Sequence, residues 1–433
     1  MRVGRVLAAA AASLLLAGVV RAEISSDQAA AIVLLPKLTV DLDNGIDTLV
    51  RLSNTSQNPL TLHCFWVDAT PRCVNGTGNC IVAIGAPDRC TGQCVDDRWN
   101  ETDFRIVLTA RQPIGWRISQ GMRDCRATAD PDQPCFRLDG ITQVGPGGQS
   151  NKGSNILPVP HDEFIGYLQC IAVDDTGAPV DRNDLKGEAL IVHSGQIGVP
   201  TQVDVEGYNG IGFQAIAGRN DRDNTLCLGG CSPGQCRLTR SRSCFSDAEC
   251  PAGETCTTQC GRNDNCPSTG PEYDGCPNIL ILDHFFDGAV DPIAELPVVT
   301  DLTLVPCSQD YLRQSPTPTT VQFLVFNEFE QRFSTSRRVN CFKEFQISKI
   351  DTDFNANSIF SAAVNGTMTG QTRIRGVADS DDDHGHAMVG VAREFRCAAG
   401  SPLDNCAVVS SASFNLHSQG RRPQADLIWL PPE

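Results

Sequence analysis

The chain has 433 residues, with 51 acidic and 35 basic side chains and a formal net charge of −16 at pH 7. Nucleic-acid affinity needs a basic face that neutralises phosphates, so this balance argues against a nucleic-acid partner. The length exceeds what one hydrophobic core usually organises, and we therefore expect two domains.

Residues 1–22 have the pattern of a signal peptide. Arg2 and Arg5 precede an apolar run over 6–20, and small or compact residues lead up to Ala22. We expect cleavage near Ala22 and release to the cell exterior or periplasm. The run is shorter than the ~20 residues that span a bilayer, so no stable membrane insertion is expected, with an uncleaved anchor as the alternative.

Residues 23–218 are predicted to form an all-β domain. Short runs rich in β-branched and aromatic residues recur between turn-forming clusters, and no stretch keeps the spacing of an amphipathic helix. Residues 49–52 and 60–67 flank the turn 54–59 as a hairpin. Later strands are expected at 104–108, 167–173, 189–192, 201–208 and 211–217. This spacing is typical of an immunoglobulin-like β-sandwich.

Residues 219–276 are expected to be a disulfide-rich, loop-dominated connector between the two domains. They contain nine cysteines, at 227, 231, 236, 244, 250, 256, 260, 266 and 276. Within 231–260, the stretch from Cys244 to Cys256 resembles the short extracellular repeats C-x-x-D-x-x-C-P-x-G-x-x-C. That resemblance implies a spacer or display module. Dense cysteine also indicates an oxidising compartment.

Residues 277–433 are predicted to repeat the first half as a second immunoglobulin-like β-sandwich. Residues 321–327 echo the strand that ends at Asn54, and Cys341 lies where Cys64 lies in the first half. The stretches 186–213 and 365–395 correspond in the same way. The alternative is a general likeness between any two all-β stretches.

Two segments of the second half, 276–287 and 327–333, are similar to a group of secreted bacterial proteins with no established activity. The resemblance implies kinship alone. It transfers no catalytic residue to this chain.

Twelve cysteines lie outside the connector, and we expect six disulfides among them. The local pairs are Cys73 with Cys80, Cys90 with Cys94, Cys125 with Cys135, and Cys397 with Cys406. The long-range pairs are Cys64 with Cys170 and Cys307 with Cys341, placed on strands of facing sheets. Connectivity does not follow from sequence, so these pairs are hypotheses, and the connector's odd number leaves one cysteine over. Zinc binding by closely spaced cysteines is the alternative.

An acidic stretch near the end of the chain is the candidate metal site. It comprises Asp379, Asp381, Asp383, His384 and His386. Aspartates on a turn can direct several oxygens at calcium, and the two histidines with an aspartate could instead hold a transition metal. The alternative is a solvated acidic loop. Weaker acidic turns surround Gly45 and Asn224, and no other cofactor is expected.

Two further groups have both a functional and a structural interpretation. Asp283, His284 and Asp287 follow the apolar run 279–282, where side chains could meet a cleft, although such a histidine is more often hydrogen-bonded in the core. The four tryptophans could form a sugar-binding platform, but core packing is the commoner role. They are Trp66, Trp99, Trp116 and Trp429.

The chain contains none of the common catalytic motifs, such as G-x-S-x-G, H-E-x-x-H or a glycine-rich phosphate loop. We therefore expect no enzyme but an exported, disulfide-stabilised, non-catalytic binding or scaffolding protein. Its partner would be an extracellular protein or glycan. The alternatives are a secreted metal-dependent hydrolase acting near Asp379 to His386 and a structural matrix or appendage subunit.

Overall fold

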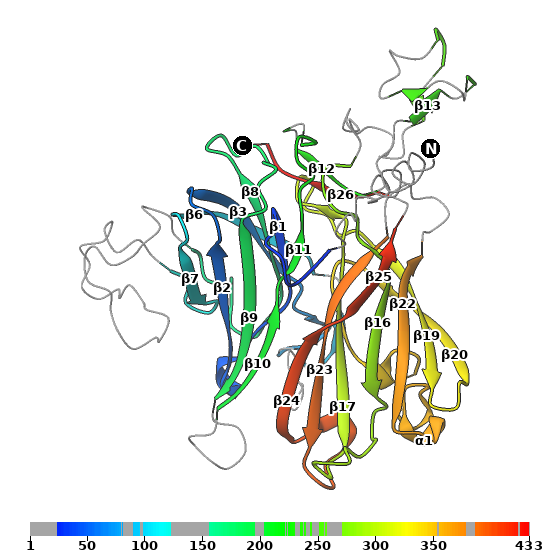
Figure 1. The fold of residues 1–433 in the computed structure, drawn as a ribbon. Helices are drawn as coiled ribbons and strands as arrows, with labels where there is room; N and C mark the ends of the chain where they lie inside the picture. The colour runs from blue at the N-terminus through cyan, green and yellow to red at the C-terminus, as the bar shows by residue number, and fades with distance from the viewer. Residues whose placement is uncertain are drawn as a thin grey trace, which may run out of the picture.

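The computed structural model describes residues 24–432 with internal gaps. The gaps are 79, 81–89, 96–97, 123–155, 195–202, 221, 223, 353–354, 378–385 and 423–424. Of residues 230–270, the structure describes 234–236, 238–239, 243–244, 251–254 and 256–257. Strands dominate the described residues (Figure 1). The helical pieces there are α1 (Ala362–Asn365), η1 (Leu42–Asn44), η3 (Ile347–Lys349), η4 (Asn355–Asn357) and η5 (Leu403–Asn405). The all-β prediction is confirmed.

The first half contains a five-stranded sheet and a four-stranded sheet. The five-stranded sheet has the order β11 (Ile211–Phe213), β1 (Ile32–Val40), β8 (Phe164–Val173), β3 (Leu60–Asp68), β6 (Asn100–Leu108). The other has the order β10 (Val203–Asn209), β9 (Leu185–Ser194), β2 (Ile46–Asn54), β7 (Pro113–Arg117). Buried side chains of both sheets belong to one core. A hairpin of β4 (Arg72–Val74) and β5 (Gln93–Val95) lies outside these sheets.

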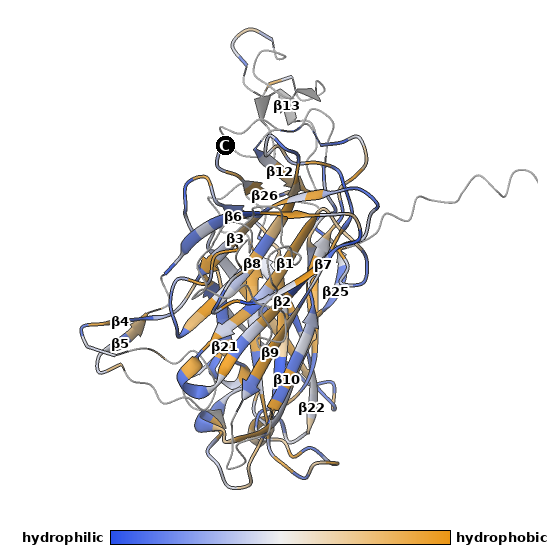
Figure 2. Cartoon of the chain, turned by 90° about the vertical axis from the view of Figure 1, so that its left-hand side faces the viewer, coloured by the Kyte–Doolittle hydropathy of each residue, from blue (hydrophilic) through white to orange (hydrophobic). Residues whose placement is uncertain are grey.

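Burial along each strand follows from what covers its faces. In β2 buried positions alternate with more accessible ones, as expected for a strand with one face on the core. The same alternation of hydrophobic and hydrophilic residues is visible along β9 and β10 in Figure 2. Every residue of β1 is buried, because the second half covers the face that points away from the core.

The second half also contains a five-stranded and a four-stranded sheet. The larger has the order β20 (Arg332–Val339), β19 (Thr319–Asn327), β22 (Thr369–Val377), β16 (Pro277–Phe285), β25 (His417–Arg421). The smaller has the order β21 (Lys343–Gln346), β17 (Val298–Pro306), β23 (Met388–Cys397), β24 (Val408–Asn415). Leu302 and Phe345 of the smaller sheet share a core with Phe323 of the larger.

The strand neighbours of the two halves agree only in part. The strand β2 lies between β7 and β9, and β19 lies between β20 and β22, but β2 belongs to the four-stranded sheet of its half and β19 to the five-stranded sheet. Asn54 and Asn327 end the strands β2 and β19. Each accepts a hydrogen bond at Oδ1 from the backbone N–H two residues on, at 2.9 and 3.0 Å. The expected correspondence of Cys341 with Cys64 is wrong, because Cys64 lies in β3 and Cys341 precedes β21.

A small sheet joins the connector to the second half. In it β26 (Asp426–Trp429) lies between β12 (Thr225–Leu228) and β18 (Gln309–Asp310). The remaining strands β13 (Gly234–Cys236), β14 (Ser243–Cys244) and β15 (Cys256–Thr257) form another sheet, drawn apart from the two halves in Figure 1.

A buried ionic network connects the halves. Arg393 of β23 donates two hydrogen bonds, each of 2.7 Å, to the carboxylate of Glu206 in β10. His193 Nε2 lies 2.6 Å from the same carboxylate. Lys37 of β1 pairs with Glu344 of β21, and the Lys37 and Arg393 side chains are almost completely buried. The contact between the halves therefore contains paired charges as well as apolar side chains.

Five disulfides lie in the described part of the chain. Cys64–Cys170 and Cys397–Cys406 were expected, but Cys64 and Cys170 face each other on adjacent strands of one sheet and not on facing sheets. Several disulfides indicate an oxidising, extracellular-type environment. Among the described residues, no helix is long and apolar enough to cross a membrane.

The other three disulfides correct the expected pairs. Cys73 bonds to Cys90 and Cys80 bonds to Cys94, whereas Cys73–Cys80 and Cys90–Cys94 were expected. The β4–β5 hairpin brings its two arms together, so the bonds cross the hairpin and do not close short loops within one arm.

Cys307 bonds to Cys276, and the expected Cys307–Cys341 pair is wrong. Cys341 is a buried free cysteine. Cys125 and Cys135 lie outside the described residues. The sulfurs of Cys80, Cys90 and Cys94 lie within 4.8 Å of one another, but all three are in disulfides and cannot act as thiolate ligands.

Candidate functional site

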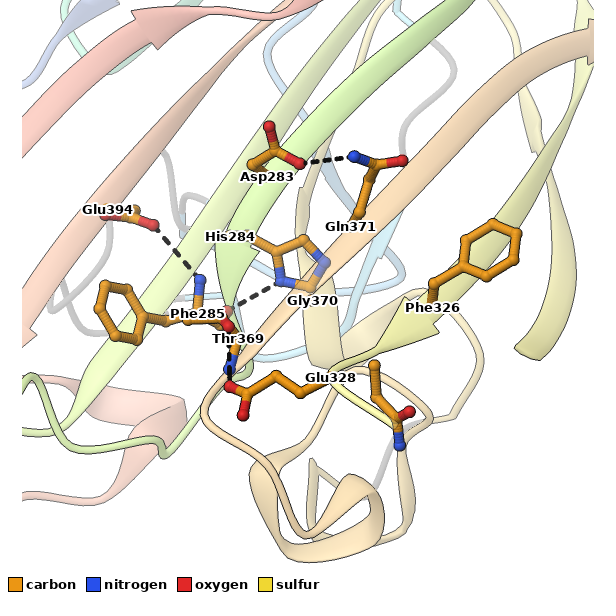
Figure 3. Close-up of a pocket in the computed structure, with 10 residues that line it drawn as sticks. Asp283, His284, Phe285, Phe326, Glu328, Thr369, Gly370, Gln371 and Glu394 are labelled. Carbon is orange, nitrogen blue, oxygen red and sulfur yellow. Dashed lines mark hydrogen bonds between the residues drawn. The ribbon is translucent and has the colours of Figure 1, made fainter. Parts of the chain in front are cut away.

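A hollow of about 460 Å³ lies at one end of the larger sheet of the second half (Figure 3). It is lined by Asp283, His284, Phe285, Phe326, Asn327, Glu328, Thr369, Gly370, Gln371 and Glu394. These residues come from the end of β16, the end of β19, the start of β22, and β23.

Successive side chains of β16 point to opposite faces of the sheet, and this alternation determines which of them line the hollow on its solvent side. Leu282 and His284 are buried, whereas Asp283 is exposed and Phe285 is partly exposed. Asp283 lies directly opposite Gln371 of β22, and its carboxylate accepts a hydrogen bond of 3.0 Å from Gln371 Nε2. This pair fixes a carboxylate and an amide beside each other on a rigid sheet.

His284 supports the hollow from the core side. Its Nδ1–H donates to the Phe285 carbonyl at 2.9 Å, so Nε2 accepts from the Thr372 hydroxyl at 2.8 Å. Burial lowers the pKa of His284 to about 4, and the ring is therefore neutral at pH 7. Both ring nitrogens are engaged, so His284 has no free nitrogen for proton exchange with a ligand.

Asp287 lies beneath this region and does not line the hollow. Its carboxylate accepts hydrogen bonds from Thr300 N–H at 2.9 Å and from the Ser348 hydroxyl at 2.5 Å. Burial raises its pKa to about 6. The structure therefore brings Asp283 and His284 to the hollow and leaves Asp287 as a structural carboxylate in the core.

Two glutamates of the lining have different environments. Glu328 accepts hydrogen bonds of 2.8 Å from the hydroxyl and the backbone N–H of Thr369, and the Thr369 hydroxyl is the main cause of its lowered pKa. Burial raises the pKa of Glu394, whose carboxylate lies 3.6 Å from the Arg396 guanidinium. Glu328 also ties the β19–β20 turn to the start of β22.

Aromatic side chains flank the polar groups. Phe285 and Phe326 are partly exposed, and Figure 3 shows their rings on opposite sides of the hollow. Phe329, in the adjoining turn, is 68% exposed and is the one aromatic among the large exposed hydrophobic residues of the described chain. Asn327 Oδ1 fixes this turn by accepting from the N–H groups of Phe329 and Gln331, both at 3.0 Å.

The other candidate groups lie elsewhere. Asp379, Asp381, Asp383 and His384 lie outside the described residues, and so do Asp221 and Asp223. His386 is buried ahead of β23. In the turn around Gly45, Asp41 accepts from Asn44, and Asp47 accepts from Thr48 and Ser119, so these carboxylates stabilise the turn and its neighbours. All four tryptophans are buried and none forms an exposed platform.

Most of the polar and aromatic lining of the hollow was not predicted from the sequence. Phe326, Glu328 and Gln371 lie on strands far apart in sequence, and only strand pairing brings them beside Asp283. One signal was present: the segments 276–287 and 327–333, which carry the resemblance to secreted bacterial proteins, both contribute to the hollow.

No protein-family model and no curated protein matches the chain. Among solved structures, one match is the N-terminal CBM22-1-CBM22-2 tandem domain from Paenibacillus barcinonensis Xyn10C, at 8% sequence identity and a TM-score of 0.15, covering 80% of this chain and 76% of that chain. A similarity at this score carries no argument about the fold or the function.

Proposed function

We propose that the protein is an exported, non-catalytic binding protein that holds a carbohydrate in the hollow. The observation that carries the proposal is the pair of partly exposed rings, Phe285 and Phe326, on either side of hydrogen-bonded carboxylate, amide and hydroxyl groups. Binding sites commonly combine apolar surface with a few fixed polar groups in this way.

The chemistry of the lining matches that of a sugar ring. A pyranose has an apolar C–H face, which packs on an aromatic ring, and hydroxyl groups at its rim, which donate and accept hydrogen bonds. Asp283 and Glu328 supply acceptors, and the amide of Gln371 can both donate and accept. Because these groups are already positioned by hydrogen bonds within the protein, little side-chain freedom is lost on binding.

Phe329 supports the same function. A ring that is 68% exposed beside a hollow adds apolar surface that a ligand can cover. Two properties support binding without catalysis: His284 is neutral, and both of its ring nitrogens are engaged in the core.

We also propose that each pair of sheets is an immunoglobulin-like β-sandwich, with domains at 23–218 and 277–433 and the connector 219–276 as a spacer. The asparagine that ends β2 and β19, with the same hydrogen bond to the turn that follows, supports a duplication. The two domains would form one unit, since the core of the first half continues into Val305, Tyr311 and Ile428.

A glycan array followed by calorimetry tests the carbohydrate proposal. The full chain should retain at least one neutral oligosaccharide, and Phe285→Ala and Asp283→Asn should each weaken its binding about tenfold, as expected for losing a stacking surface or a charged hydrogen-bond acceptor. Ile293→Ala is the matched control because it removes an exposed apolar side chain that does not line the hollow. No retained glycan, or equal binding by the variants and the control, would contradict the proposal.

A further inference from the structure

The outer face of the sheet that ends at the hollow carries four arginines. Arg332 and Arg338 lie on β20, and Arg373 and Arg375 lie on β22. Arg332, Arg338 and Arg375 are exposed, and Arg373 is partly exposed, with its guanidinium 2.5 Å from Gln419 Oε1. None of the four forms an ion pair with a carboxylate of the described residues.

Strand register places these arginines on the two sides of β19. Across the sheet, Gln322 lies between Ser336 and Arg375, and Leu324 lies between Ser334 and Arg373. The next outward residue, Phe326, lies between Arg332 and Gln371. We call the outward side chains of β19 and the four flanking arginines the arginine track. Phe326 and Gln371 also line the hollow, so the track and the hollow are continuous.

The size of the track suits an extended chain. With neighbouring strands about 4.8 Å apart, the two columns of arginines are about 10 Å apart, and the six-residue step from Arg332 to Arg338 spans about 20 Å. A ligand several sugar units long can lie along β19 between the columns.

The charge of the track contrasts with that of the whole protein. The chain carries a net charge of −16, yet four guanidinium groups that form no ion pair within the described part of the chain lie together on this face. Guanidinium groups bind carboxylates through two parallel hydrogen bonds. The acidic side chains at the hollow, Asp283 and Glu328, repel anions from that end and accept hydrogen bonds from uncharged hydroxyl groups.

The form of the surface favours a polysaccharide over a peptide. An extended peptide binds a sheet by adding to its edge through backbone hydrogen bonds, whereas the track offers side chains on the face of a central strand. We propose that the arginine track binds a carboxylated polysaccharide, a polyuronate, whose chain lies along β19 with its carboxylates on the arginines. This inference rests on the proposed function.

Binding of polygalacturonate oligomers to the full chain tests the inference. Affinity should fall as salt rises from about 50 to about 300 mM, because exposed charges are screened. The double variant R373Q/R375Q should bind about tenfold more weakly or worse, since two guanidinium–carboxylate pairs are lost. The control R105Q/R117Q removes the same charge from exposed sites on the first half and should bind as the wild type does.

The outcomes separate the two proposals. If R373Q/R375Q no longer binds polygalacturonate but still binds a neutral oligosaccharide, both the proposed function and the inference stand. If polygalacturonate binds through the track but no neutral sugar is retained, the inference stands and the sugar site in the hollow fails. Absence of polygalacturonate binding, equal loss in both double variants, or tighter track-dependent binding of dextran sulfate would overturn the inference.

Discussion

The buried pair between Arg393 and Glu206 permits a quantitative prediction. Replacing Arg393 with Met removes two charge-assisted hydrogen bonds of 2.7 Å. The Glu206 carboxylate, whose side chain has 0% exposure, then keeps His193 Nε2 and the Ser413 hydroxyl as hydrogen-bond partners. Breaking a buried pair in this way costs about 3–5 kcal/mol, because the remaining charge is neither solvated nor fully paired. We expect Arg393→Met to lower the free energy of unfolding by that amount.

Urea unfolding of the intact, oxidised protein measures this loss. The control is Arg51→Met, which breaks an ion pair with Glu188 whose side chains are 46% and 39% exposed. Exposed pairs contribute about 0–1 kcal/mol. A second variant, R393M/E206L, removes both charges and should be more stable than Arg393→Met. If Arg393→Met lost no more than the control, or if the double variant were less stable than the single one, the reasoning would be refuted.

The same pair predicts a pH dependence. Burial alone would raise the pKa of Glu206, but Arg393 and His193 outweigh it and hold the pKa well below its ordinary value of 4.5. The folded state therefore binds fewer protons than the unfolded state, so this stabilisation is present above about pH 4.5 and is lost as the pH falls toward the folded-state pKa. The difference between wild type and Arg393→Met should shrink correspondingly.

Three further predictions concern separate parts of the structure. Burial lowers the pKa of His284 to about 4, so the wild type should lose stability as the pH falls from about 6.5 to 4. The urea midpoint of His284→Gln should change less with pH over this range, and an equal change in the two proteins would contradict the assignment. The disulfide Cys64–Cys170 closes a loop of 106 residues, and Cys397–Cys406 closes one of 9. In the chain-entropy account, removing the first should therefore lower the free energy of unfolding by about 2 kcal/mol more than removing the second. Similar melting temperatures for the two double alanine variants would contradict this account. Burial raises the pKa of Cys341 to about 12, so iodoacetamide at about pH 8 should label this thiol only after unfolding, as peptide mass analysis would show; labelling of the native protein would place Cys341 at the surface.

Local patterns predicted the fold class, because alternation and turn residues are properties of short segments. The strand that ends at Asn54 and the later one that ends at Asn327 are recognisable from composition and from a terminal asparagine that caps a turn. Disulfide partners were harder to predict. Cys64–Cys170 was expected for the wrong geometric reason, and the cysteines of the β4–β5 hairpin pair across it.

The candidate site depends on register, which a single sequence does not specify. Asp283 and His284 were recognisable at the end of an apolar run. The positions of Gln371 and Phe326 beside them depend on β22 lying between β16 and β19. A shift of one residue in either pairing would turn these side chains to the opposite face. The arginine track likewise could not be predicted from the alternating arginines of β22 alone, because it depends on the pairing of β22 with β19 and of β19 with β20.

The small sheet that joins the connector to the second half also constrains the order of folding. The central strand β26 (Asp426–Trp429) pairs with β12 (Thr225–Leu228), about two hundred residues earlier, and with β18. Contacts this distant in sequence form late, because a long stretch of chain must be ordered before they are made. During synthesis, the edge of β12 that pairs with β26 therefore stays open until β26 has been made, and a chain truncated before Asp426 would leave that edge open to other chains.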